Sequence, residues 1–405
     1  MKHVRLWMGG TLLSSFFLMQ AAYSAAFELY ELGTPIIGTA GVGQAAVADD
    51  ASTTYFNPAG MAKLNHSQFL LGSQMVLPYT IFSPNRQNTL SGDNGGNAAA
   101  LIPGIGMYYV YRCSPKLRFG VSLTSPYGGV LNYNQGWVGR YIVQDMQFYT
   151  LNLNPTVAYK FNDWVAIGGG VAIEYANLHE TVAIPILGAI DGQGNIKVDN
   201  TAAGFNLGIL LSPNDSTKLG LAYRSKISHD LHGNTTFLRI GATPSTSTRM
   251  VMPQNVMLSL VQDLTCQFTL LGELGWANWA SMRDTVVNIA GFSATTPRDW
   301  NNTYRVGLGG HYKLNSAWLL KAGVSYDSSP TDSQHRQPDL PMDRQVRVGA
   351  GVAYSPIKPV KLGFSYEYIN FGDANIYNAS STGILAGFYP RNYANVVQAS
   401  INVDV

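Results

Sequence analysis

The residues of this sequence that could do chemistry are few, and they stand singly among apolar and small neighbours. The clearest are four cations: Arg224, Arg305, Lys321 and Arg347. A guanidinium or ammonium group in an apolar surrounding can hold a carboxylate through a charge-assisted hydrogen bond. The same cations can also pair with acidic side chains of the chain itself. The sequence leaves open which of these two roles they have.

No other pattern indicates chemistry. The seven histidines are scattered, with no pair at the spacing of metal ligands, so we expect no metal site. The glycines of Gly41-Val42-Gly43 follow no strand and precede no nearby basic residue, which argues against a phosphate loop. We therefore expect no cofactor and no enzymatic activity. A net charge of +2 without a basic stripe also predicts no binding to nucleic acid.

The composition indicates which elements must position the cations. Charged residues make up 12% of the chain and hydrophobic residues 46%, so an ordinary charged exterior is missing. After residue 24 no apolar run approaches the ~18 residues that a membrane helix needs. A chain that spans a membrane without helices must form a closed barrel, because only closure pairs every backbone group in lipid. A secreted all-β protein is the alternative.

An export signal is predicted over residues 1–24. Lys2, His3 and Arg5 form a positive start, the apolar middle runs over 6–19, and Ser24 ends a small-residue cleavage site. A second cleavage site is possible two residues later, before Phe27. The chain is thus expected to leave the cytoplasm of a Gram-negative bacterium.

Residues 67–405 are expected to form a 14-stranded antiparallel barrel of the outer-membrane type. Six short turns recur at intervals of roughly fifty residues, with longer polar segments between them. The strands alternate, as at Trp318, Leu320 and Val324 against Lys321, so one face is apolar. The six turns lie near residues 114–116, 162–163, 212–215, 263–265, 315–316 and 355–359. The expected outer loops lie near residues 83–100, 127–139, 183–200, 231–251, 281–301, 329–342 and 371–390.

Residues 25–66 precede the first strand and are rich in glycine and alanine, so we interpret them as a plug, or hatch, inside the barrel. Asn57 can cap a short helix, because Pro58 is tolerated in the first helical turn. We expect this cap to anchor the hatch to the wall, although a plain capped turn is the alternative. Asp49 and Asp50 can pair with the lumen cations or lie in a solvated bend.

Two further regions are candidate sites. Proline cannot donate to a strand ladder and glycine weakens one, so pairing should fail at Ser125-Pro126-Tyr127-Gly128-Gly129, unless these residues simply begin an outer loop. Apolar residues in two outer loops, 183–200 and 371–390, suggest surfaces for ligand capture, unless they only extend the strands. The capture candidates are Ile184, Ile186, Leu187, Ile384, Leu385 and Phe388.

An ordered set of motifs resembles the FadL-type long-chain fatty-acid and hydrocarbon transporters of bacterial outer membranes. The resemblance spans the whole chain after the signal and includes the strand count. The motifs are Ala26-Phe27-Glu28-Leu29, Gly38-Thr39-Ala40-Gly41, Ala48-Asp49-Asp50-Ala51, Asn57-Pro58-Ala59, Thr124-Ser125-Pro126-Tyr127-Gly128, Trp137-Val138-Gly139-Arg140-Tyr141 and Asn152-Leu153-Asn154-Pro155.

The resemblance implies a hatch of short helices that includes Phe27 and Ala59. It also implies capture of a hydrophobic molecule at the outer loops, transfer to an apolar lumen pocket, and lateral release at a kinked third strand near Pro126. The terminal Val405 departs from the aromatic residue that commonly ends such barrels. The expected partners are a fatty acid or hydrocarbon and the lipid and lipopolysaccharide of the outer membrane, and we expect a monomer. A general diffusion porin and an adhesin are the alternative functions.

Overall fold

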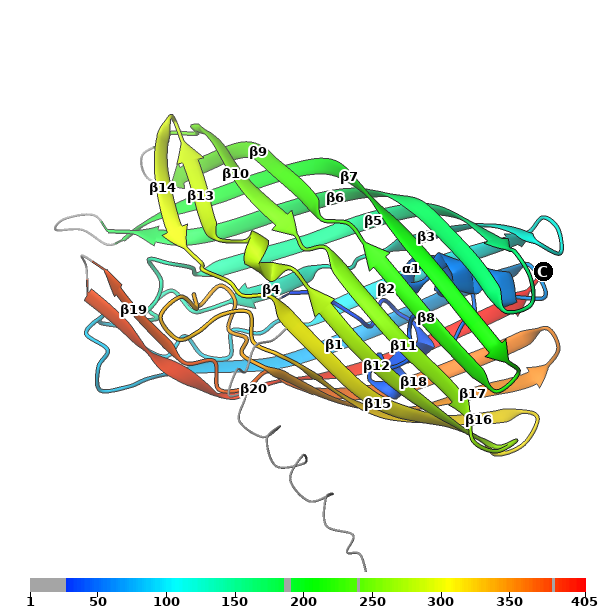
Figure 1. Ribbon diagram of the computed structural model, residues 1–405. Helices are drawn as coiled ribbons and strands as arrows, with labels where there is room; N and C mark the ends of the chain where they lie inside the picture. The colour runs from blue at the N-terminus through cyan, green and yellow to red at the C-terminus, as the bar shows by residue number, and fades with distance from the viewer. Residues whose placement is uncertain (1–26, 186–190, 239–240, 381–382) are drawn as a thin grey trace, which may run out of the picture.

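The computed structural model describes residues 27–185, 191–238, 241–380 and 383–405 (Figure 1). The predicted export signal, Ile186 and Leu187 lie outside these residues. The strands form one sheet whose first strand pairs with its last, β1 with β20, so the sheet closes into a barrel. The strands are β1 (Gln68–Pro84), β2 (Ile102–Arg112), β3 (Leu117–Thr124), β4 (Gly128–Asn132), β5 (Asp145–Lys160), β6 (Val165–Ile184), β7 (Gly192–Asn214), β8 (Thr217–Arg224), β9 (Ile227–Leu238), β10 (Ser245–Met252), β11 (Asn255–Asp263), β12 (Phe268–Ala277), β13 (Asp284–Ile289), β14 (Phe292–Pro297), β15 (Thr303–Lys313), β16 (Trp318–Asp327), β17 (Gln345–Ile357), β18 (Val360–Asn370), β19 (Ile376–Ser380) and β20 (Gly383–Asp404).

These elements make fourteen wall strands, because six of the wall strands are interrupted and appear as two elements each. For example, β7 pairs with both β8 and β9, and β5 pairs with both β3 and β4. The predicted 14-stranded antiparallel barrel is confirmed. The predicted turns are also found, since six tight connections lie at the end where the chain terminates (right in Figure 1). In barrels of this kind the short turns face the periplasm.

The alternation of the strands places apolar side chains outside and polar ones inside. In β16 the outward side chains of Trp318, Leu320 and Val324 are 39%, 41% and 46% exposed, whereas Lys321 is 6% exposed. A contiguous apolar exterior of this extent is stable only against lipid, because in water it would drive association. Among the described residues, no helix has the length and apolarity needed to cross a bilayer.

Several segments predicted as outer loops are strands, and those predictions are wrong. Residues 231–251 fall largely in β9 and β10, residues 281–301 contain the β13–β14 hairpin after the short helix η3 (Trp279–Ser281), and β7 begins at Gly192. The last predicted loop, 371–390, contains β19 and the start of β20. These extensions rise above the apolar band at the end opposite the tight turns (Figure 1). Their inward side chains include buried apolar residues such as Ile196 and Leu231, but outward positions such as Asp230 are polar, so the apolar outer face that indicates a membrane strand is absent.

The segment before β1 lies inside the barrel, near the end with the tight turns (Figure 1). It contains three short helices, η1 (Pro35–Thr39), α1 (Thr53–Phe56) and η2 (Pro58–Lys63). The fit is close: a Cβ built on wall residue Gly72 would lie 1.7 Å from the carbonyl oxygen of Gly33. Glycine on the inner wall therefore makes room for the backbone of this segment, which we call the hatch (residues 27–67).

Candidate ligand path and hatch

The third wall strand is broken where the sequence predicts a failure of pairing. β3 ends at Thr124 and β4 begins at Gly128. The hatch fills the break with two backbone hydrogen bonds: the Leu29 N–H donates to the Pro126 carbonyl at 2.8 Å, and the Gly128 N–H donates to the Phe27 carbonyl at 3.1 Å. The start of the hatch thus pairs as a short strand opposite Tyr127.

Beside this break, β2 is not paired along its full length with the third wall strand. The β2–β3 ladder runs only as far as Met107 opposite Leu123. The remaining residues of β2, down to Ile102, pair with β1 alone. Farther out, the segment before β2 meets β4 again, because Ala99 bridges Leu131, so the gap between β2 and β4 is a local stretch in which β2 pairs on one side only. Unpaired backbone facing lipid is costly, so it is tolerated where it borders a protein-lined passage.

An apolar cavity lies directly inside this gap, and we call it the lower cavity. Its lining includes Ile102 on one side of the gap and Gly128 and Gly129 on the other. The hatch supplies Phe27, Glu28, Leu29 and Glu31, and the rest of the lining is mainly aliphatic or aromatic and includes Val76, Pro78, Val130, Met342, Ile369 and Phe371.

A second cavity shares Phe27, Gly129 and Met342 with the first, and we call it the upper cavity. The Phe27 ring lies 5.1 Å, centroid to centroid, from both Phe148 and Trp279, in edge-to-face contact. Aromatic pairs at this spacing are favourable beyond their buried area. The side chain of Phe27 therefore sits at the junction of the two cavities, on the segment that also fills the strand break.

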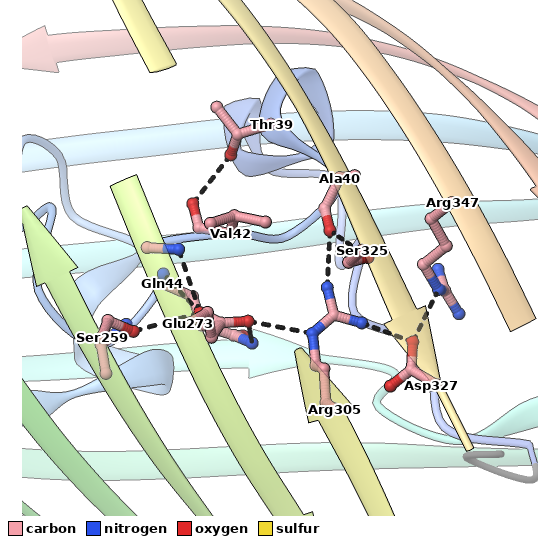
Figure 2. Close-up of polar contacts among 12 residues, drawn as sticks. Thr39, Ala40, Val42, Gln44, Ser259, Glu273, Arg305, Ser325, Asp327 and Arg347 are labelled. Carbon is pink, nitrogen blue, oxygen red and sulfur yellow. Dashed lines mark hydrogen bonds and ion pairs between the residues drawn. The ribbon is translucent and has the colours of Figure 1, made fainter. Parts of the chain in front are cut away.

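The four predicted lumen cations are buried, and the guanidinium groups of Arg305 and Arg347 both lie against the wall carboxylate of Asp327 (Figure 2). Arg305 donates to Glu273 at 2.9 Å, to Asp327 at 2.7 Å, and to the carbonyl of hatch residue Ala40. Arg347 donates to hatch residue Glu31, and its guanidinium lies 3.5 Å from Glu367 and 3.6 Å from Asp327. The ring of hatch residue Tyr30 lies between the two guanidinium groups, 4.3 and 5.1 Å from its centroid.

Lys321 contributes to a second polar contact between hatch and wall. Its Nζ lies 4.0 Å from the Asp49 carboxylate, and the Nζ of Lys361 lies 3.5 Å from the same group. Burial alone would raise the pKa of Asp49, but the two ammonium groups outweigh it and the pKa is lowered. Asp50 does not meet these cations; its carboxylate accepts from the backbone and hydroxyl of Ser52.

Arg224 differs from the other three because it forms no ion pair with the described residues. Its Nη2 donates to the Tyr55 carbonyl at 2.7 Å, and its guanidinium stacks on the Tyr55 ring at 3.8 Å. Its Nη1 has no hydrogen-bond partner, and neither has the Nδ2 of Asn206. Both residues line a third pocket, which is also lined by Glu28 and Asn255 and is far more polar than the two cavities.

Asn57 caps η2 and also ties the hatch to the wall. Its Oδ1 accepts from the Ala59 N–H at 3.1 Å, and Pro58 occupies the first helical position. Its Nδ2 donates to the Ala45 carbonyl at 2.6 Å and to the carbonyl of wall residue Ile209 at 3.1 Å. The side chain is fully buried. One amide therefore links two parts of the hatch and β7.

Sequence reasoning singled out Phe27 at the start of the hatch but missed the acidic residues close to it. Glu28 accepts from the Asn255 amide at 3.0 Å, and burial raises its pKa to about 7, with a further contribution from Asp327. The available signal was the stretch Glu28–Glu31, in which two acids flank Tyr30 within an otherwise uncharged region.

The predicted capture loops differ from the structure. Ile184 ends β6, while Ile384, Leu385 and Phe388 belong to β20 and pair with β19 or β1. Leu385 is 1% exposed, so it is no part of a free surface. It packs in a cluster of buried rings that closes this side of the outer end; the rings are Phe82, Tyr133, Trp137 and Tyr389.

Comparison with known proteins agrees with this geometry. The sequence model of the family described as outer membrane protein transport protein (OMPP1/FadL/TodX) matches residues 15–403. The long-chain fatty acid transport protein of Salmonella typhi is 26% identical over 387 residues, covering 86% of this chain and 88% of that protein. The crystal structure of a Pseudomonas aeruginosa FadL homologue superposes with a TM-score of 0.87, at 22% identity, over 94% of this chain and all of that one. The toluene transporter TbuX of Ralstonia pickettii gives a TM-score of 0.70 at 18% identity, over 92% and 98% of the two chains.

Proposed function

This chain belongs to the outer membrane protein transport protein family (OMPP1/FadL/TodX), and we propose that it releases its ligand sideways into the membrane through the break between β2 and β4. The protein is an outer-membrane transporter of hydrophobic substrates and not an enzyme. Relatives are named for transport of long-chain fatty acids and of toluene. Both substrates are apolar enough to dissolve in lipid, which makes a lateral exit physically sensible.

The path begins at the outer end of the barrel. The raised hairpins β9–β10, β13–β14 and β19–β20 surround this end, and we propose that a lipophile is captured between them (Figure 1). It then enters the upper cavity, whose apolar lining stabilises it by about 0.8 kcal/mol for each methylene buried. Capture therefore needs no covalent chemistry and no cofactor.

The hatch controls the second half of the path. Phe27 stands between the cavities, and the backbone of residues 27–29 occupies the strand break. When this segment withdraws, the upper and lower cavities merge and the lower cavity opens toward the gap beside Ile102. The observation that carries the proposal is this coincidence: one three-residue segment closes both the junction and the gap.

Withdrawal of this segment breaks few hydrogen bonds. Two backbone bonds are lost at Pro126 and Gly128, together with the bond from Asn255 to Glu28, each worth about 1 kcal/mol net. The aromatic contacts of Phe27 are also lost, but a lipophile entering the same cage replaces them. Ligand binding therefore favours the withdrawn state through its own differential contacts.

A reversible cross-link tests the proposal. Glu28 and Tyr127 face each other in a non-hydrogen-bonded antiparallel pair, where Cα atoms are about 4.5 Å apart, a separation that a disulfide spans. Glu28→Cys with Tyr127→Cys, in a background with Cys113→Ser and Cys266→Ser, should fix the hatch in the break when oxidised. We expect cells carrying the oxidised variant to lose uptake of oleate, hexadecanol and toluene, and to regain it after reduction.

The cysteine-free background, oxidised and reduced in the same way, is the control. Equal uptake by the oxidised and reduced double-cysteine variant contradicts the lateral route. A general porin is the alternative, and single-channel conductance distinguishes it: a porin passes a steady large current, whereas we expect near silence from a barrel whose lumen the hatch fills.

A further inference from the structure

The positively charged side chains that line the two apolar cavities are already paired with carboxylates of the chain, and this limits which ligands the cavities can bind. Among the described lining residues the cations are Arg347 in the lower cavity and Arg298 in the upper one. Arg347 is held by the carboxylates of Glu31, Glu367 and Asp327. The cation of the lower cavity is therefore already paired with carboxylates.

Arg298 is bound through both ends of its guanidinium by Asp339, with Nη1 2.8 Å from Oδ1, and its Nε donates to Thr285 at 3.0 Å. Both partners of the pair are largely buried, at 12% and 14% side-chain exposure. A two-point guanidinium–carboxylate contact of this kind uses the geometry that a ligand carboxylate would need. A fatty-acid anion would have to displace Asp339 to reach this arginine.

Two further polar groups line the upper cavity. Glu180 is half-buried and makes no hydrogen bond or ion pair with the described residues, although Arg298 and Asp339 lie near enough to act on its charge. The Thr248 hydroxyl lines it too, and its oxygen is buried with no hydrogen-bond partner. A carboxylate accepts and a threonine hydroxyl can donate. A buried hydroxyl without a partner is costly, so the Thr248 hydroxyl favours a ligand that satisfies it, and the half-buried Glu180 carboxylate can accept a hydrogen bond from such a ligand.

We propose that Glu180 is a specificity-determining residue that selects uncharged lipophiles bearing a hydroxyl group over fatty-acid anions. This inference rests on the proposed uptake function and names its substrate class. A ligand hydroxyl donates to Glu180 and accepts from Thr248, while its alkyl or aryl part fills the apolar lining. A ligand carboxylate instead meets Glu180 and Asp339, and like charges at close range cost enough to weaken binding at least about tenfold.

Binding of three ligands of equal chain length to the purified full barrel in nanodiscs tests the inference, with empty nanodiscs subtracted. At pH 10, where both Glu180 and palmitate are ionised, we expect hexadecanol to bind more tightly than hexadecane, and palmitate to bind at least about tenfold more weakly than hexadecanol. Glu180→Leu should abolish the preference for hexadecanol over hexadecane. Asp339→Asn should strengthen palmitate binding, because it releases Arg298. Asp230→Asn is the matched control: it removes an aspartate charge from the exposed Asp230–Arg249 pair, and it should leave the binding of all three ligands unchanged.

The outcomes separate this inference from the function on which it rests. Palmitate binding as tight as hexadecanol binding, or no preference for hexadecanol over hexadecane, overturns the inference and leaves uptake of lipophiles intact. Palmitate binding that disappears in Arg224→Met overturns it too, because the carboxylate then sits in the polar third pocket. Absence of binding by all three ligands overturns both the inference and the proposed function.

Discussion

Replacement of Asn57 by alanine should loosen the hatch without unfolding the wall. The side chain is fully buried and makes three hydrogen bonds, to Ala59, Ala45 and Ile209. Each lost bond costs about 1 kcal/mol, and a buried group left without a partner adds to this. The expected loss is about 3 kcal/mol, which shifts the ratio of docked to undocked hatch by about a hundredfold.

Amide hydrogen exchange and conductance measure this shift. In Asn57→Ala, exchange in residues 45–63 should accelerate by about the same factor of a hundred, and planar bilayers should show brief openings to small ions. Asn154→Ala is the matched control, because Asn154 is equally buried and its amide bonds only wall residues Val171 and Asn206. If both variants leave exchange in the hatch unchanged, Asn57 is only a local cap and the reasoning fails.

Three further predictions concern the hatch and the break. When the hatch is docked, the pKa of Glu28 is raised from its ordinary 4.5 to about 7, so docking is strongest below pH 4.5 and weakens as the pH rises through 7. Conductance of the barrel should therefore increase from pH 5 to pH 8. The Glu28→Gln variant should lose this pH dependence. Arg305→Met leaves Glu273 buried without its cation, so it should destabilise the barrel by about 3–5 kcal/mol, measured by its shift on heated gels, and adding Glu273→Gln should restore part of the loss. Pro126→Val with Gly129→Val should allow β3 to continue into β4 and slow toluene uptake, while the heated-gel shift stays that of the unaltered protein.

The sequence was most informative where lipid imposes a strict rule. Each membrane-spanning strand must show apolar residues to lipid at alternate positions, so β16 and β18 were predicted within one residue at each end. The tight turns followed from their polar residues. The strand break followed from Pro126 and Gly128, because proline cannot donate to a ladder in any context.

Prediction failed where contacts come from residues far apart in the chain. The pair Arg298–Asp339 joins two segments predicted as separate loops, and neither residue carries a local signal. Leu385 was predicted to be exposed because it lies in an apolar stretch between strands, but β20 begins before it and turns it onto Phe82 and Tyr389. The pairing of residues 27–29 with the strand break at Tyr127 could not be predicted either, because it depends on where the rest of the barrel places the hatch.

The chemistry of the hatch explains how a plug can be both tight and movable. Several of its anchors are polar: Glu31 on Arg347, Asp49 on Lys361, and the Ala40 carbonyl on Arg305. Buried ion pairs are rarely the most stable way to fill a space, because desolvation opposes their attraction. Their advantage here is that water can replace them when the hatch shifts, whereas an apolar interface would expose its surface. Other anchors are apolar, since hatch residues Val42 and Ala59 pack in one cluster with wall residue Leu271. The cage around Phe27 lines both cavities, so we propose that a lipophile can substitute for Phe27 there and lower the cost of releasing the hatch.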